Sequence, residues 1–446
     1  MRRVILEATD ENVLNSIKEN TYNRIEDIKD FVYALESIEG NMFISLDARW
    51  GEGKTFYVRQ IEKTLEYLTK RTWGNEEIGE TASEVENLRH YFKNTTLDSI
   101  ILEQSYLPIY YNAWLYDNHD DPLMSLVLII AKIAEGYLDT KMPTSFSEKI
   151  AALLSIPSLT VKDIQLGFDG SNLKKAIEGK DIFENIKTAE EIRNMVKEIL
   201  NEVIVERAER LVVFIDELDR CKPSYAIEML ERIKPYFDDE RIIFVVSVNK
   251  EQLIHTISKC YGSNFDSTGY LNKFFDLNVH MPVVSKNYIS RTININQMYR
   301  QNHLNKIVDG LNDYYKLTIR DSILFRERVN ILAPHVVNDY EAEGCCLSLF
   351  IPLIAILDIV DEKEKIKFLK GESNIIETIS IEVPAIYTMI CRFGDSEQDK
   401  YAVGLKKIQA VYDYAFKNKE KYEDLLLDVS YDFKALCMRL CNGFLK

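Results

Sequence analysis

Five short apolar stretches recur in the first two thirds of the chain, and segments with helical spacing separate them. The apolar stretches are residues 41–48, 107–114, 210–219, 241–249 and 277–283. Apolar positions with helical spacing are clearest in residues 11–38, 55–70 and 225–237. Strands that alternate with helices predict a parallel sheet covered by helices on both faces, which is an α/β fold.

The alternation is interrupted twice and then ends. We expect helical insertions at about residues 60–105 and 123–205, where the next strand is delayed. After about residue 290 the pattern becomes mostly helical, with apolar runs such as LSLFIPLIAILDIV. We therefore predict a first domain over residues 1–290 and a mostly helical C-terminal domain over residues 291–446.

The run PLMSLVLIIAKIAEGYL, which begins at Pro122, is interpreted as the most apolar of the chain. It contains a lysine and a glutamate and is shorter than the roughly 20 apolar residues that span a bilayer. We interpret it as a buried helix and expect no membrane association. Seven cysteines without a CxxC pair, and no signal peptide, indicate reduced thiols and a cytoplasmic protein.

Two cysteine pairs allow more than one interpretation. Cys437 and Cys441 lie one helical turn apart, which suits either a metal-binding pair or one buried helix face. The adjacent Cys345 and Cys346 allow the same two interpretations, and we favour burial for both pairs. The formal net charge is −16, which argues against a basic surface over the whole molecule. Nucleic acid remains among the possible partners, but the net charge of the chain does not indicate it.

The stretch DARWGEGKT, residues 47–55, is close to the phosphate-loop pattern G-x-x-x-x-G-K-[ST]. Gly53, Lys54 and Thr55 occupy its last three positions, and Ala48 replaces its first glycine. A strand precedes this stretch and a helix follows it, as a phosphate loop requires. The residues expected to contact the nucleotide are Ala48, Trp50, Gly51, Glu52, Gly53, Lys54, Thr55 and Phe56.

Chemistry can be assigned to four of these positions. Gly51 and Gly53 permit the tight backbone whose N–H groups face the phosphates. Lys54 is expected to reach the β- and γ-phosphates, and the Thr55 hydroxyl is expected to ligate Mg²⁺.

A second motif follows the third apolar stretch. The sequence LVVFIDELDR, residues 211–220, places Asp216 and Glu217 directly after a buried strand. Asp216 is expected to hold the Mg²⁺ shell, and Glu217 to orient and deprotonate the attacking water. Acids at strand ends also serve as helix caps, but this order after a GKT helix favours a site for ATP or GTP.

Four segments together resemble the motifs of the KAP-type P-loop NTPases. They are ARWGEGKT, YNAWLYD, VVFIDELDRCKP and YLNKFFDLNVHMP, and the resemblance covers roughly residues 20–290. Ala48 departs from the glycine usual in the family, and the paired transmembrane helices of many members have no counterpart here. The resemblance implies an NTPase switch of the AAA+/STAND-like group, and several bacterial members are tied to phage exclusion or defence.

Other residues carry open alternatives. Asn249 ends the fourth apolar stretch, where it either faces the γ-phosphate or caps a loop. Lys273 lies where AAA-type relatives place an arginine finger, but a solvated surface lysine is the more common role at such a position. Asn112 and Trp114 match the family's N-A-W motif, although Trp114 suits a core position as well. Arg220 either pairs locally with Asp219, which we favour, or reaches a neighbouring subunit.

These residues predict an ATPase that uses ATP and Mg²⁺ as a molecular switch. We expect a homo-oligomer that acts with a co-encoded effector protein in antiviral defence, because no HExxH, GxSxG or deaminase motif supplies a second activity. One alternative is a nucleotide-binding scaffold without turnover. Another is a DNA-associated motor, which the acidic charge disfavours.

Overall fold

The computed structural model divides the chain into two compact units, Leu6–Val283 and Val284–Lys446. The sequence analysis places the boundary between the two domains at residue 290, and in the structure it falls between Val283 and Val284. The residues that the structure describes are 7–74, 80–119, 121–137, 149, 189–204, 208–282, 302–332, 336, 341–394, 399–417, 427, 429–430 and 432–443.

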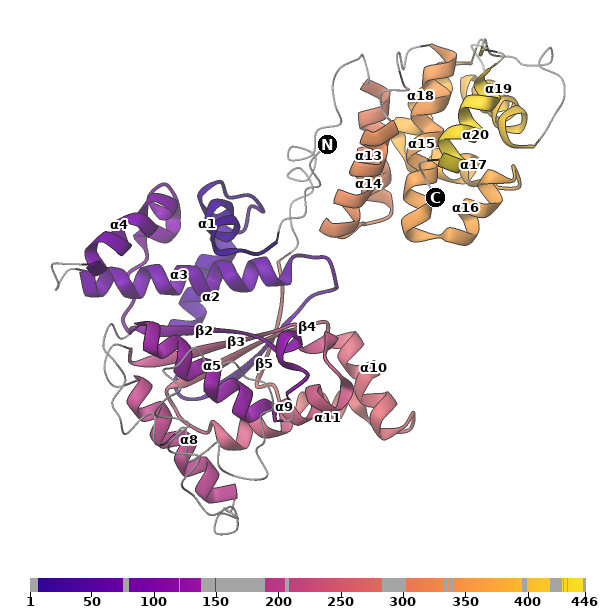
Figure 1. The fold of residues 1–446 in the computed structure, drawn as a ribbon. Coiled ribbons are helices and arrows are strands. Elements are labelled where there is room, and N and C mark those ends of the chain that lie inside the picture. Colours follow the sequence, from indigo (N-terminus) through magenta and orange to yellow (C-terminus); the bar gives the residue numbers. More distant parts are fainter. Residues whose placement is uncertain are drawn as a thin grey trace. The chain divides into compact units, whose positions relative to one another are not determined.

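The first unit contains a sheet of five parallel strands (Figure 1). The strands are β1 Met42–Asp47, β2 Tyr106–Asn112, β3 Arg210–Asp216, β4 Ile242–Val248 and β5 Leu277–His280. Their order across the sheet is β2-β3-β4-β1-β5. Every position of β3 and β4 is buried, as expected for strands with helices on both faces. All five predicted strands are present, and the predicted α/β fold class is confirmed.

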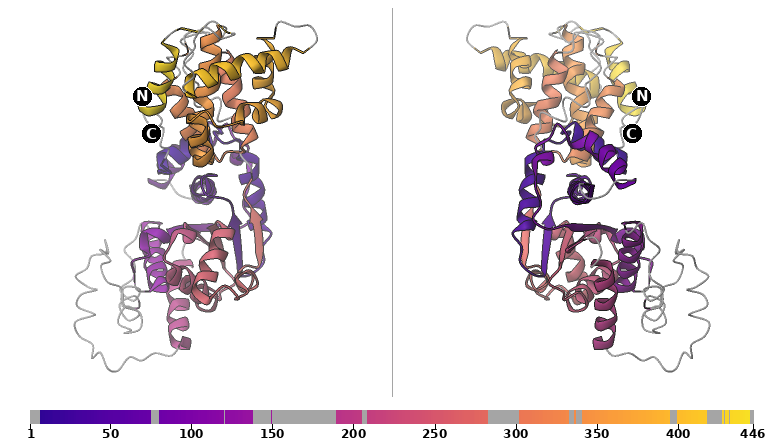
Figure 2. Two further views of the ribbon diagram at one scale, coloured as in Figure 1. Left: turned by 90° about the vertical axis from the view of Figure 1, so that its right-hand side faces the viewer. Right: turned by 90° about the vertical axis from the view of Figure 1, so that its left-hand side faces the viewer.

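Helices cover both faces of this sheet (Figures 1 and 2). On one face lie α1 Asp10–Lys18, α2 Ile25–Glu36, α3 Lys54–Gly74 and α4 Glu80–Phe92. On the other lie α5 Pro122–Tyr137, α8 Ala189–Ile204, α9 Pro223–Tyr236, α10 Lys250–Tyr261 and α11 Ser267–Asn272. Among the described residues of the unit there are also three short 3₁₀ turns, η1 Thr96–Ser99, η2 Ala113–Tyr116 and η3 Leu218–Arg220.

Helix α3 occupies the start of the first expected insertion, and α4 and η1 lie later in it. Helices α5 and α8 lie in the second expected insertion. Most of the chain between them is outside the described residues.

Residues 11–38, where the sequence shows helical spacing, form two helices. Helix α1 ends at Lys18 and α2 begins at Ile25, and Asn20 and Asn23 between them have φ angles of 47° and 52°. Asparagine adopts this left-handed conformation more readily than most residues, and two such positions stop a helix. The break brings Tyr22 and Arg24 beside the start of α3, where Phe56 packs edge-on against Tyr22.

The described part of the second unit is helical, as predicted. Its helices are α13 Asn302–Tyr314, α14 Ile319–Leu332, α15 Ala342–Val360, α16 Glu362–Leu369, α17 Ile375–Glu382, α18 Pro384–Cys391, α19 Lys400–Phe416 and α20 Phe433–Gly443. Cys345, Cys346 and Cys437 are buried in the apolar core of this unit. That burial favours the packing interpretation of Cys345 and Cys346, and of Cys437 in the second pair, whose other member, Cys441, has its side chain outside the described residues.

Helix α15 corrects the expectation that the run beginning at Pro122 is the most apolar. Within the described residues, α15 alone is long and apolar enough to cross a membrane, with 19 residues and a mean hydropathy of 2.1. However, 78% of that window is buried inside the protein. The apolar surface of α15 is therefore packed against neighbouring helices, whereas in a membrane it would face lipid.

Candidate nucleotide site

The phosphate loop connects β1 to α3 and has the backbone that its glycines predict. Gly51 and Gly53 have φ angles of 85° and 81°, which favour glycine over other residues. Ala48 is absent from the residues with positive φ, and its N–H donates to the Val248 carbonyl at 3.1 Å. The residue at the first glycine position therefore continues β1 into the loop, where alanine causes no strain.

Lys54 and Trp50 both contact Asp219, which lies in η3. The Lys54 Nζ donates to the Ala48 carbonyl at 2.9 Å and lies 3.7 Å from Asp219 Oδ2. The Trp50 indole N–H donates to the same carboxylate oxygen. Sequence reasoning did not assign Asp219 to the loop, although the residue lies only two positions after Glu217. Its contacts join the phosphate loop to the turn that carries the acids.

The two predicted acids lie at the carboxyl end of β3, opposite the start of α3. Asp216 is fully buried and accepts a hydrogen bond from the Tyr110 hydroxyl at 3.2 Å. Burial raises the pKa of Asp216, and a hydrogen bond from Thr55 partly opposes this shift. The Thr55 hydroxyl also donates to Glu217 Oε1 at 3.4 Å. The structure thus brings together Thr55, Asp216 and Glu217, which were assigned to magnesium and to catalysis.

Glu217 is held in an unusual conformation. Its φ angle is 62°, in the left-handed region that only a few non-glycine residues adopt. Its Oε2 forms an ion pair with Arg220 at 2.9 Å. The expected local pair of Arg220 with Asp219 is therefore wrong, because the Asp219 carboxylate faces Trp50 and Lys54 while Arg220 turns back to Glu217.

The N-A-W segment lies at the end of β2, beside these acids. The Asn112 side chain accepts hydrogen bonds from the N–H groups of Trp114 and Leu115 and caps η2. Trp114 is 50% exposed, so a core position for it is wrong. The Arg220 guanidinium lies 5.6 Å from the centroid of a Trp114 ring. Trp114 therefore supports the arginine that pairs with Glu217.

Three other predicted residues have contacts of their own. Phe56 is buried and packs against Tyr22, so only its backbone faces the loop. Asn249 caps α10 by accepting a hydrogen bond from the Gln252 N–H at 3.2 Å, and this leaves its amide nitrogen as a donor. Lys273 is exposed and lies just before the amino end of β5. The phosphate loop follows the carboxyl end of the neighbouring parallel strand β1, so the two lie at opposite ends of the strands. A catalytic role for Lys273 would therefore require a second copy of the chain.

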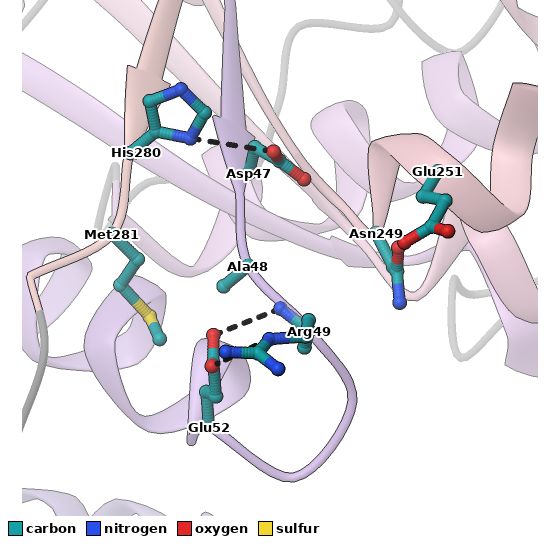
Figure 3. A pocket seen from close by; sticks show the side chains of 8 residues that line it. All are labelled: Asp47, Ala48, Arg49, Glu52, Asn249, Glu251, His280 and Met281. Carbon is teal, nitrogen blue, oxygen red and sulfur yellow. Dashed lines mark hydrogen bonds and ion pairs between the residues drawn. The ribbon is translucent and has the colours of Figure 1, made fainter. Parts of the chain in front are cut away.

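A pocket of about 220 Å³ lies beside the loop, at the carboxyl ends of β1, β4 and β5 (Figure 3). It is lined by Asp47, Ala48, Arg49, Glu52, Asn249, Glu251, His280 and Met281. Glu52 turns back toward the loop and accepts a hydrogen bond from the Arg49 N–H at 2.9 Å. Of the predicted nucleotide contacts, this pocket contains Ala48, Glu52 and Asn249. The two predicted acids lie at the carboxyl end of β3, beyond β4.

The donor set suits magnesium better than a metal held by protein alone. Within the described ranges, no group of three or more His, Cys, Asp or Glu side chains could hold a metal ion. Magnesium is commonly bound through one or two carboxylates and the phosphates of its substrate. The Asp216 carboxylate and the Thr55 hydroxyl, beside a glycine loop at a helix start, fit that mode of binding.

Comparison with known proteins supports this assignment. The sequence profile described as the KAP family P-loop domain matches residues 8–330, which is more than half of the chain. An uncharacterized protein of Methanocaldococcus jannaschii is 25% identical over 169 residues, which cover 30% of this chain and 86% of that relative. The parallel sheet, the phosphate loop and the two acids agree with the matched profile. The chain belongs to the KAP family of P-loop NTPases.

Proposed function

We propose that this NTPase binds Mg·ATP at the loop between β1 and α3 and hydrolyses it slowly, as a conformational switch. One observation carries the proposal: Thr55 at the start of α3 lies within hydrogen-bond reach of Glu217, and Asp216 is buried beside them. Phosphate binding and water activation would then occur at one place. A binding module without turnover has no need of the second acid.

Each residue has a distinct part in this proposal. The Lys54 ammonium, now bound to a backbone carbonyl, would exchange that contact for phosphate oxygens. Thr55 and Asp216 would hold magnesium, which neutralises the charge that develops on the phosphates. Asn249 offers an amide N–H toward the γ-phosphate side of the loop because its oxygen is already engaged by α10.

Glu217 would accept the proton of the attacking water. Its two carboxylate oxygens are held by Thr55 and Arg220, so one of these contacts must open before water takes its place. That requirement is consistent with slow turnover and with control of hydrolysis by conformation.

The proposed base predicts a pH dependence. Burial, and then the negative charge of Asp216, raise the pKa of Glu217 above its ordinary value of 4.5, while Arg220 opposes the shift. A base must be deprotonated, so turnover should decrease as the pH falls through this raised pKa. We expect the loss at a higher pH than for an exposed glutamate, in kcat profiles measured over about pH 4–9. A kcat that stays constant down to pH 4.5, with the protein folded by circular dichroism, would argue against Glu217 as the base.

The output of the switch is a further part of the proposal. We infer a cytoplasmic homo-oligomer that acts with a co-encoded effector in defence against phage, since the resemblance points there and no second active site is recognised in the sequence. If Lys273 acts as a cationic finger, it acts on the nucleotide of a neighbouring copy. Light scattering of Glu217→Gln with and without Mg·ATP should then detect assembly that depends on ATP.

Plaque counts test the defence role. Cells that carry the whole operon should form fewer plaques than cells without it, and Lys54→Ala should abolish the difference. Lys259→Ala, an exposed lysine on α10, should keep protection. Equal plaque numbers with and without the intact operon across a broad phage panel would exclude this role and leave the NTPase assignment in place.

A further inference from the structure

Arg24 is a buried arginine directly behind the phosphate loop. It follows the break between α1 and α2, and only 2% of its surface is exposed. Its guanidinium donates hydrogen bonds to the carbonyl oxygens of Glu52 at 3.0 Å, Gly53 at 3.4 Å and Pro282 at 3.2 Å. Its acceptors are therefore backbone carbonyls, and two of them belong to the phosphate loop.

These contacts orient the opposite side of the loop. In a trans peptide, the carbonyl of one residue and the N–H of the next point in opposite directions. Holding the Glu52 and Gly53 carbonyls on Arg24 therefore turns the N–H groups of Gly53 and Lys54 away from the arginine. Those N–H groups belong to the row that a phosphate loop presents to its anion.

The positive charge of Arg24 also favours binding of an anion at the loop. Burial lowers its pKa to about 10, so the guanidinium stays protonated at neutral pH. The rings of Tyr22 and Tyr57 shield it from water, with centroids 5.7 and 5.3 Å from the guanidinium carbon. A cation sheltered in this way is screened less than one in solvent and attracts an anion on the other side of the loop.

We propose that Arg24 is a positioning residue for phosphate binding, which orients the loop N–H groups and supplies a buried positive charge behind them. It also ties the loop to Pro282, the last described residue before the chain enters the second unit. The inference rests on the proposed nucleotide site and assigns to it a residue outside the phosphate-loop motif.

Arg210 provides a matched control. It is 5% exposed, and its guanidinium also donates to three backbone carbonyls, those of Ile38, Gly40 and Glu240. It begins β3, at the end of that strand opposite Asp216. Loss of either arginine removes a buried guanidinium that holds three carbonyls, but only Arg24 contacts the phosphate loop.

The experiment measures binding of Mg·ADP and Mg·ATP by calorimetry to wild type, Arg24→Gln, Arg24→Lys and Arg210→Gln. Arg24→Gln should weaken both nucleotides by roughly tenfold or more, because a charge-assisted contact to the loop is lost. Arg24→Lys should be intermediate, since it keeps the charge and loses the planar fork. Arg210→Gln should bind like wild type even where its unfolding temperature falls as far.

Steady-state kinetics add a second readout: Arg24→Gln should raise KM more than it lowers kcat. Wild-type affinity in folded Arg24→Gln, or an equal loss of affinity in Arg24→Gln and Arg210→Gln, would overturn the assignment of Arg24 and leave the proposed function intact. If Arg24→Gln does not fold, wild-type affinity in Arg24→Lys together with normal KM would overturn it. Failure of the wild type to bind either nucleotide would overturn the proposed function and this inference together.

Discussion

Lys54→Ala should bind Mg·ATP more weakly than wild type, with a binding constant lower on the order of 100-fold. The lysine is the only cationic side chain of the GKT segment, and its Nζ lies at the loop, bound to Ala48 O. Removing it takes away the main positive charge for the phosphates. It also leaves the buried Asp219 carboxylate without its nearest cation, which adds repulsion toward an anion.

Calorimetry with Mg·ATP measures this loss, and circular dichroism checks that the variant is folded. Lys259→Ala serves as the matched control, because it removes an exposed lysine from the same unit. Wild-type affinity in Lys54→Ala would refute the assignment of this loop as the nucleotide site.

Glu217→Gln should bind Mg·ATP and release almost no phosphate, with turnover reduced by about 10²–10⁴. Glutamine nearly preserves the shape of the side chain and still accepts a hydrogen bond from Thr55. It cannot take a proton from water at neutral pH, so the bound ATP persists. Phosphate release and ATP binding must therefore be measured on the same preparation.

Glu11→Gln, which changes an exposed glutamate of α1, is the control for the loss of one carboxylate. If Glu217→Gln turns over ATP at the rate of wild type, another group activates the water. A loss of binding parallel to the loss of turnover would instead mean that Glu217 positions the nucleotide.

The sheet and the site were largely predictable because their signals are local. Each strand is a continuous apolar run, and the glycines, Lys54 and the two acids lie within short motifs next to those runs. Parallel strands with one order of elements bring their carboxyl ends to one edge, so the loop and the acids had to meet there. Ala48 replaces the first glycine of the motif without a positive φ angle, because this position continues β1.

The features that sequence reasoning missed depend on contacts between distant segments. Arg24 lies in a stretch where the sequence shows only helical spacing, and its carbonyl acceptors are 28, 29 and 258 positions away. The pairing of Arg220 with Glu217 depends on the left-handed backbone of Glu217, which no residue pattern signals. The exposure of Trp114 likewise depends on how η2 turns out of β2. Contacts of this kind form between residues that only the tertiary structure brings together, so local sequence propensities do not predict them.

The most direct test of the account is release of inorganic phosphate by the purified wild-type chain in the presence of Mg·ATP. The account predicts continuous release, proportional to protein concentration, that exceeds one phosphate per chain and stops when EDTA removes magnesium. Bound ATP in calorimetry without any phosphate released above the buffer blank would contradict it, and would identify the chain as a nucleotide-binding scaffold.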